Sequence, residues 1–260
     1  MRKQLWRYFV AACTLAMTSS LVPSATAQTS EVKEKPPLYS YVADWSIPRA
    51  QWPEMEKANA SDKAILDKAI ANGTLVGYGD DTSLVHQPDG TTHDDWWSSM
   101  SMAGLLNVLD EMTKSGTPAS PVLASATKHS DYIFVSRHYN WHSGSWKGVY
   151  TRVGSYKLKA DAPDDALEVL SKNMIVPLLE KLLADGTIHQ YEIDTQAIHS
   201  TDPASFWIVY IAANAEGLDK VNAALQAMSK ASPLNGTAFD SVVDSTKHRD
   251  ELLRANATFK

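Results

Sequence analysis

The sequence predicts an α+β protein made of two similar halves, each with the element order β-α-β-β-α-β. Residues 71–86 align with residues 184–199 without a gap, so that Gly, Thr, Tyr, Asp, Thr and His recur at the same places. Three shorter matches follow in the same order: Trp96-Trp97 with Phe206-Trp207, Gly104-Leu105 with Gly217-Leu218, and residues 127–131 with residues 246–250. Four matched blocks over about 100 residues indicate an internal duplication.

In the first half, local patterns predict a strand, a helix, two strands, a second helix and a last strand. The strands are expected over residues 39–45, 74–86, 96–103 and 132–139, and the first helix over residues 62–71. Leu105, Leu109 and Met112 recur at helical spacing and predict the second helix. Gly73 is placed to end the first helix in the left-handed conformation.

The second half repeats this order. Its strands are expected over residues 149–158, 187–199 and 206–213, with a weaker one over residues 251–259 that is also compatible with a helix at its start. A helix is expected to start after Pro163 and to run through residues 166–183. Asp164 and Asp165 fall in its first turn, where the helix dipole favours acidic groups. Pro177 should kink or split this helix, and Leu218, Val221 and Leu225 predict the second one.

The order β-α-β-β-α-β is that of the ferredoxin-like split βαβ unit. Two tandem ferredoxin-like repeats in one chain resemble the dimeric α/β-barrel superfamily, which includes antibiotic-biosynthesis-type monooxygenases, stress-response barrel proteins and haem-binding chlorite-dismutase-like proteins. The resemblance implies that residues 38–142 and 148–260 pack as a pseudo-dimeric α/β barrel, with a ligand cavity inside the barrel or between sheet and helices. No subfamily motif is present, so no family residue role carries over.

The N-terminal segment has the pattern of an export signal. Residues 1–27 combine basic residues, a short apolar stretch and a closing Ala25-Thr26-Ala27, which predicts a signal peptide. Residues 28–37 are expected to form a flexible leader. Cleavage would remove Cys13, the only cysteine, and a lipoprotein anchored through Cys13 is the disfavoured alternative. We therefore expect a periplasmic or secreted protein without a transmembrane segment, a monomer with internal pseudo-two-fold symmetry.

Charge and motifs exclude several function classes. The formal net charge is −6, from 24 basic and 30 acidic residues, which disfavours a nucleic-acid partner. The sequence contains no phosphate-binding Gly-rich loop, no G-x-S-x-G elbow and no H-E-x-x-H zinc motif.

The duplicated strands provide one set of candidate catalytic residues. Alternation places Tyr78 and His86 on one strand face, and Tyr191 and His199 on the equivalent face of the other copy. A Tyr and a His on one face could transfer protons around a bound ligand. The alternative is that both copies keep these residues because both fold alike. The repeated Thr-Lys-His sequences before the last strands are better explained by turn or cap chemistry.

A second candidate site is the stretch 136–146, which the second half does not repeat. It contributes Arg137, His138, Tyr139 and Trp141 as candidate ligand-binding residues, and the competing interpretation is a linker between the repeats. Trp97 and Trp207 are added as candidates because a cavity lined by Trp suits a flat apolar ligand. No metal site is predicted, since His138 and His142 lie in a strand and turn and not on one helix face.

Two functions remain open. The first is an exported cell-envelope protein that binds a small, largely apolar or aromatic molecule in a barrel cavity. The alternative is an exported oxidoreductase, either a cofactor-free monooxygenase or a haem-dependent enzyme, that uses a cavity His or Tyr. Whether the protein is an enzyme stays open. No cofactor is predicted, although the resemblance makes haem an alternative. A third possible function is an interaction module that uses exposed sheet edges.

Overall fold

The computed structural model describes residues 35–87, 90–231 and 233–260. The predicted signal peptide, residues 1–27, and most of the predicted leader lie outside these residues. The described strands are β1 (Leu38–Ser46), β2 (Gly77–Ser83), β3 (His93–Ser99), β4 (Lys128–Trp141), β5 (Gly144–Lys157), β6 (Ile188–Gln196), β7 (Ser205–Ala212) and β8 (Arg249–Phe259). The described α-helices are α1 (Trp52–Ala71), α2 (Met102–Ser115), α3 (Pro121–Ala124), α4 (Ala166–Leu170), α5 (Val176–Ala184), α6 (Ala215–Ala231) and α7 (Pro233–Val242).

The strands close into a barrel in which every neighbouring pair is antiparallel. The order around the barrel is β1-β3-β2-β8-β5-β7-β6-β4. Within each half the order is that of a ferredoxin-like sheet, β4-β1-β3-β2 and β8-β5-β7-β6. The halves join where β2 pairs with β8 and β4 pairs with β6. The predicted fold class, two ferredoxin-like repeats that form a pseudo-dimeric α/β barrel, is confirmed.

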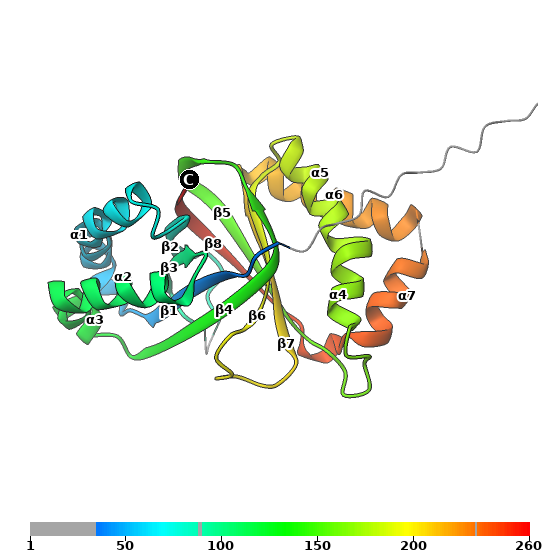
Figure 1. The fold of residues 1–260 in the computed structure, drawn as a ribbon, viewed down its shortest axis with the longest axis horizontal. Helices are drawn as coiled ribbons and strands as arrows, with labels where there is room; N and C mark the ends of the chain where they lie inside the picture. The colour runs from blue at the N-terminus through cyan, green and yellow to red at the C-terminus, as the bar shows by residue number, and fades with distance from the viewer. Residues whose placement is uncertain (1–34, 88–89, 232) are drawn as a thin grey trace, which may run out of the picture. The chain divides into compact units, whose positions relative to one another are not determined.

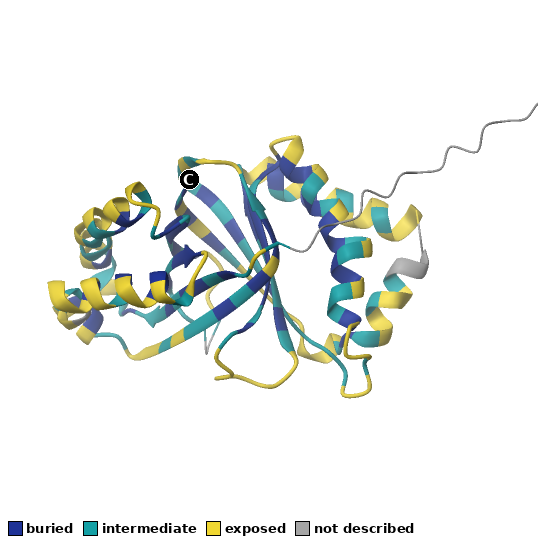
Figure 2. Ribbon diagram, viewed as in Figure 1, coloured by how far each residue is buried: buried dark blue, intermediate teal, exposed yellow. Residues whose placement is uncertain are grey.

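Helices cover the outside of the barrel in two layers. The helices α1, α2 and α3 pack against the sheet of the first half, and α4 to α7 against that of the second (Figure 1). Each layer has its own apolar core. One is centred on Leu75, Trp97 and Leu105, and the other on Leu179, Ile188 and Phe206. Buried residues therefore occur on both faces of the strands (Figure 2), because one face packs against helices and the other lines the barrel interior.

The register shows how the duplication maps onto the fold. Tyr78 pairs with Trp97 across β2 and β3, and Tyr191 pairs with Tyr210 across β6 and β7. Trp97 is thus the structural equivalent of Tyr210. The sequence alignment of Trp96-Trp97 with Phe206-Trp207 is wrong by three places, because the shared Trp suggested a gap that the fold does not contain.

The two matched glycines have a common structural cause. A Cβ on Gly104 would lie 3.0 Å from the backbone oxygen of Thr74, and a Cβ on Gly217 would lie 2.8 Å from that of Thr187. In both halves the second helix therefore begins in close contact with the backbone that precedes the second strand. Only glycine fits this approach without displacing one of the two segments.

Several predicted boundaries differ from the structure. The strand β2 ends at Ser83 and β6 ends at Gln196, so the predicted strands were too long. The weak last segment is a full strand, since β8 has a partner on each side. Pro177 lies at the start of α5, just after the π-helical turn Ser171–Ile175, so the expected split of the helix is confirmed. Among the described helices, none is long and apolar enough to cross a membrane.

Candidate functional site

The described residues form three cavities of interest, one inside the barrel and one under each helical layer. The lumen cavity, inside the barrel, has a volume of about 230 Å³. The α1–α2 cavity lies between the first helical layer and its sheet, with about 570 Å³, and the α5–α6 cavity is its counterpart in the second half, with about 270 Å³.

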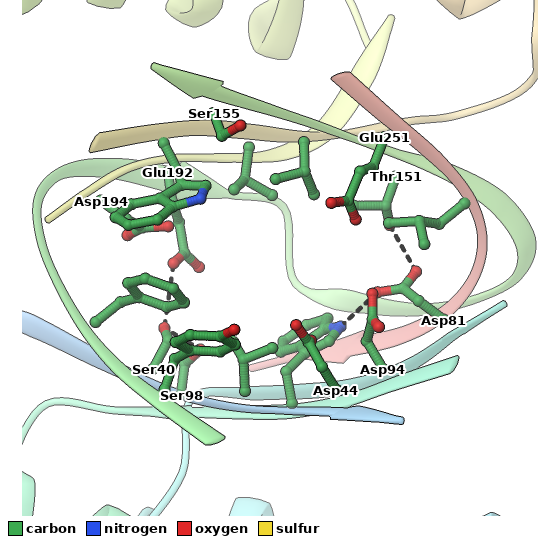
Figure 3. Close-up of a pocket in the computed structure, with 18 of the residues that line it drawn as sticks. Ser40, Asp44, Asp81, Asp94, Ser98, Thr151, Ser155, Glu192, Asp194 and Glu251 are labelled. Carbon is green, nitrogen blue, oxygen red and sulfur yellow. Dashed lines mark hydrogen bonds between the residues drawn. The ribbon is translucent and has the colours of Figure 1, made fainter. Parts of the chain in front are cut away.

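The lumen cavity is lined by carboxyl groups from both halves. They are Asp44, Asp81, Asp94, Glu192, Asp194 and Glu251. Figure 3 shows Glu192 and Asp194 on one side of the cavity, and Asp81, Asp94 and Glu251 on the other. Alternation explains the arrangement, since Asp44 points inward while its neighbours Ala43 and Trp45 line the α1–α2 cavity.

Asp81 accepts hydrogen bonds from both halves. Its Oδ1 accepts a 2.8 Å hydrogen bond from Thr151 Oγ1 on β5, and its Oδ2 accepts one of 3.0 Å from the indole of Trp96 on β3. Burial raises the pKa of Asp81 to about 7. Burial and the neighbouring charges of Asp44 and Asp81 raise the pKa of Asp94 well above its usual range.

The opposite side of the lumen carries a second carboxyl pair. Ser40 donates a 3.1 Å hydrogen bond to Oε2 of Glu192 and shares one of 2.8 Å with Ser98. Burial raises the pKa of Glu192 to about 7, and burial together with the charge of Glu192 raises that of Asp194 well above its usual range. Asp194 Oδ1 and Gln190 Oε1 are buried and have no hydrogen-bond partner.

Aromatic side chains pack beside β8 next to the lumen cavity. Phe259 lies 5.4 Å from Trp96, 5.7 Å from Trp141 and 6.4 Å from Trp146 between ring centroids. These rings pack on a cluster that includes Ala255 and Ala257 of β8. The small alanines leave room for the large rings of the facing strands.

The α1–α2 cavity has an aromatic wall, and five carboxyl groups also line it, those of Glu56, Asp62, Asp80, Asp95 and Asp131. Tyr41 and Trp97 stack at 4.4 Å between ring centroids, and both line the cavity with Met112 of α2. Burial, followed by the charge of Asp80, raises the pKa of Asp95 well above its usual range.

The duplicated tyrosines face the helices and not the lumen. Tyr78 donates a 2.6 Å hydrogen bond to Asp67 of α1, and Tyr191 donates one of 2.6 Å to Glu180 of α5. Tyr78 lines the α1–α2 cavity. The two tyrosines therefore lie under different helical layers and do not share one void.

The candidate histidines of the duplicated set lie outside the strands. His86 and His199 are exposed in the loops that follow β2 and β6. His86 lies 5.6 Å from the ring of Trp52. Neither histidine lines one of the three cavities, and neither lies beside its tyrosine partner of the sequence pattern.

The stretch 136–146 is spread over several environments. Arg137 is exposed at the bulge where the register of β4 and β6 shifts. His138 is buried with Nε2 2.8 Å from Glu168 Oε2, and Tyr139 donates a 2.8 Å hydrogen bond to the backbone oxygen of Pro36. Trp141 donates to the backbone oxygen of Lys260. The structure thus does not bring these four side chains together in a cavity.

The two remaining candidates occupy different cavities. Trp97 lines the α1–α2 cavity and Trp207 lines the lumen cavity, where its ring lies 4.8 Å from that of Phe134.

The repeated Thr-Lys-His sequences form one arrangement twice. His129 stacks on Trp45 at 3.5 Å, and His248 stacks on Tyr156 at 4.4 Å. In each case Nδ1 lies within hydrogen-bond distance of a backbone oxygen of the neighbouring strand, and Nε2 lies close to the aspartate two residues later, at 3.1 and 3.2 Å. Both imidazoles are thereby fixed at a strand start, which agrees with a structural role.

The comparisons with known proteins agree with this geometry. No family profile and no curated protein matches the sequence. Among solved structures, a protein described as a putative monooxygenase from Lactobacillus acidophilus has a TM-score of 0.62 at 12% identity, over 86% of this chain and 97% of that one. This chain has the dimeric α/β-barrel fold.

Two further structures support the same assignment. A putative monooxygenase from Fusobacterium nucleatum has a TM-score of 0.64 at 10% identity, over 86% of this chain and 94% of that one. A protein described as a putative chlorite dismutase has a TM-score of 0.50 at 10% identity, over 84% and 94%. At these identities the likeness shows the shared α/β barrel and not a shared reaction.

The cavities of this α/β barrel do not offer a histidine ligand to haem. Among the described histidines, only His129 lines one of the three cavities, and both of its ring nitrogens lie within 3.1 Å of an oxygen of Asp44 or Asp131. The described residues also contain no cluster of three or more His, Cys, Asp or Glu side chains that could hold a metal ion. We therefore derive no step through haem.

Sequence analysis missed the lumen carboxyls of this α/β barrel. Asp81 and Asp194 occupy the same place in the two aligned blocks, but neither is among the candidate site residues of the sequence analysis. Strand alternation places them on the face opposite Tyr78 and Tyr191, and this was the signal available in the sequence. It could not be used, because sequence does not show which face of a barrel strand meets the lumen.

Proposed function

We propose that this protein is an exported binding protein for a small, largely apolar aromatic molecule, which it holds in the α1–α2 cavity. The observation that supports this site most directly is its volume of about 570 Å³ beside the stacked Tyr41 and Trp97. This lies in the usual range for small-molecule sites, about 300 to 1,000 Å³. The lumen cavity has six carboxyl groups in less than half this volume, so it is a poorer match for an apolar ligand.

The walls of the α1–α2 cavity explain how such a ligand would be held. An aromatic ligand that stacks in an offset geometry on this pair would gain about 0.5–1.5 kcal/mol beyond area burial. Met112 supplies an adaptable apolar contact from the helix side. A hydrogen bond between the carboxyl group of Asp95, which lines the cavity, and a phenol hydroxyl of the ligand would orient the ring.

The proposal is tested with an aromatic probe and a pair of matched variants. Titration of the purified protein with 2-naphthol should quench tryptophan fluorescence saturably. Met112→Phe fills the α1–α2 cavity and should weaken binding at least tenfold. Its structural counterpart Leu225→Phe, in the α5–α6 cavity, should leave binding unchanged. Equal loss in both variants, or no saturable quenching in the wild type, would refute the site.

Export is the second part of the proposal, and it rests on the signal-like residues 1–27. Expression of the full chain in a bacterium should yield mature protein in the periplasm or medium that begins after Ala27. N-terminal sequencing of the purified protein checks this directly. A protein recovered only from the cytoplasm with residues 1–27 intact would contradict it.

A second candidate function is cofactor-free oxygenation of the ligand in the same cavity. Two of the structural neighbours are described as putative monooxygenases, and a buried carboxyl with a raised pKa is a suitable proton acceptor once it ionises. Asp95 would remove a proton from an activated CH₂ group, and the substrate carbanion would supply electrons to O₂. The balance is R₂CH₂ + O₂ → R₂C=O + H₂O, with no external reductant.

Oxygen uptake separates the two functions. With an anthrone-type substrate, which has an activated CH₂ group, wild-type protein would consume O₂ and Asp95→Asn would lose this activity while it still binds 2-naphthol. Binding without oxygen uptake by the wild type across such substrates would leave the binding function alone.

A further inference from the structure

The lumen cavity concentrates acidic groups without lining cations. None of the described residues that line it is Lys, Arg or His. Among the described residues, the basic charges that act on its carboxyls are those of Lys128 and Arg249, the first residues of β4 and β8. Burial of several carboxyls in one cavity is costly unless a cation or protons compensate their charge.

A separate observation indicates that this cavity receives a ligand. Gln190 is 2% exposed and lines the cavity, but its Oε1 accepts no hydrogen bond. Asp194, 4% exposed, likewise leaves Oδ1 without a partner. Buried acceptors are rarely left unpaired. Both unpaired acceptors belong to side chains that line this cavity, which places them beside a ligand that carries several donor hydrogens.

The acceptors form two separated groups with apolar surface between them. Glu192 and Asp194 lie on one side, while Asp81 and Asp94 lie across the cavity (Figure 3). Val42, Val153 and Val209 line the same cavity, and Trp207 and Phe134 add ring surfaces. An alkyl chain with a donor cation at each end matches this pattern, because the chain meets the valines and the cations meet the carboxyls.

We propose that the lumen cavity binds a small aliphatic diamine as its dication, with one ammonium held by Gln190, Glu192 and Asp194 and the other by Asp81 and Asp94. An ammonium group has three donors and no acceptor, which suits unpaired carboxyl and amide oxygens. Ring faces next to an ammonium add cation–π attraction. The volume of about 230 Å³ restricts the ligand to a short chain. A bare metal ion fits less well, since the described residues form no cluster of three metal-binding side chains.

Calorimetry with matched small molecules tests the proposal. At pH 8 the mature protein is titrated with 1,3-diaminopropane, 1,4-diaminobutane and 1,5-diaminopentane, with 1-aminobutane and with 1,4-butanediol. At least one diamine should bind ten times more tightly than 1-aminobutane, and 1,4-butanediol should show no binding. Diamine binding no tighter than that of the monoamine would overturn the proposal, as would equal binding of the diol.

Variants on the two sides of the lumen assign the two ammonium positions. Glu192→Gln and Asp94→Asn should each weaken diamine binding at least tenfold. Glu111→Gln removes an exposed carboxylate of α2, about half exposed, and should have no effect. An equal loss in all three variants would mean nonspecific charge attraction and would refute the site.

A direct signal from the bound ligand keeps the test independent of folding defects. The methylene protons of the diamine should shift upfield in the NMR spectrum when they lie near Trp207, and Trp207→Leu should abolish that shift. The site is separate from the proposed aromatic site, so Met112→Phe should leave diamine binding intact. If the wild type binds a diamine but not 2-naphthol, the proposed function is refuted and the lumen site stands. If it binds 2-naphthol but no diamine, the lumen site is refuted and the proposed function stands.

Discussion

The hydroxyl of Tyr191 donates a 2.6 Å hydrogen bond to Oε1 of Glu180, which lies eleven residues earlier on α5. The same spacing joins Tyr78 to Asp67 of α1. In each half this bond ties the second strand to the helix that precedes it. The duplicated tyrosines are thus explained by the way each repeat fixes its first helix to the sheet.

Removal of the tyrosine hydroxyl should therefore cost stability, and more in the second half. Tyr191 is 1% exposed and bonds to a carboxylate, so Tyr191→Phe should lower the unfolding free energy by about 2 kcal/mol. Tyr78→Phe should cost about 1 kcal/mol, because Asp67 is 52% exposed and water can replace the bond. Urea unfolding measures both. A larger loss for Tyr78→Phe would contradict the assignment.

The lumen carboxyls predict that the protein becomes more stable as the pH falls from 8 to 5.5. The folded-state pKa values of Asp81 and Glu192 are raised to about 7. A raised carboxyl pKa means that folding favours the protonated form. Its stabilisation is complete below the unfolded pKa, near 4, and is lost as the pH rises through about 7.

The size of this effect is set by proton linkage. Each such carboxyl contributes up to about 1.4 kcal/mol per pH unit within the window. Thermal unfolding at pH 5.5, 6.5, 7.5 and 8.5 should show a rising melting temperature toward the acid side. A protein that is most stable at pH 8.5 would show that the carboxyls ionise freely in the folded state.

Neutralisation of one lumen carboxyl should stabilise the ligand-free protein at high pH. Asp94 lies among other carboxyls, and its Oδ1 accepts a 3.2 Å hydrogen bond from Thr91 that an amide oxygen can also accept. Asp94→Asn should raise the unfolding free energy at pH 8 by about 1–2 kcal/mol and change it little at pH 5.5. Glu111→Gln is the control, with no pH-dependent gain expected.

A substitution at Gly217, where the helix contacts the backbone, should instead lower the unfolding free energy. Gly217→Ala places a Cβ 2.8 Å from the backbone oxygen of Thr187, which should cost about 1–3 kcal/mol. Gly236→Ala in α7 is the matched control, because its Cβ meets nothing closer than 3.8 Å. That change should stabilise the helix by about 0.5–1 kcal/mol. Differential scanning calorimetry of both variants tests the contact, and similar melting temperatures would contradict it.

The fold could be predicted because the duplication preserved residues that each repeat needs. Gly104 and Gly217 mark the helix–strand contact in both copies, and the order of elements followed from them. The closing strand β8 was harder to predict. Ala255 and Ala257 have low β propensity, and the strand is formed by its two neighbours, β2 and β5, which sequence patterns do not reveal.

The sequence predicted the chemical type of some cavity residues but not their positions in the fold. Trp97 and Trp207 were identified as cavity residues from their chemistry, but sequence could not show that they lie in two cavities on opposite faces of the sheet. Asp81 and Asp94 in a strand are ordinarily interpreted as solvent-facing groups. They point into a closed barrel here because both faces of the strand are covered, so the usual rule that polar positions mark the wet face does not apply.

The barrel is completed by β8, whose eleven residues, Arg249–Phe259, pair with a strand from each half. The barrel can therefore close only once β8 is free to pair with β2 and β5 at the same time. A chain shortened before Arg249 would expose two strand edges at once and should accumulate as an aggregation-prone open sheet.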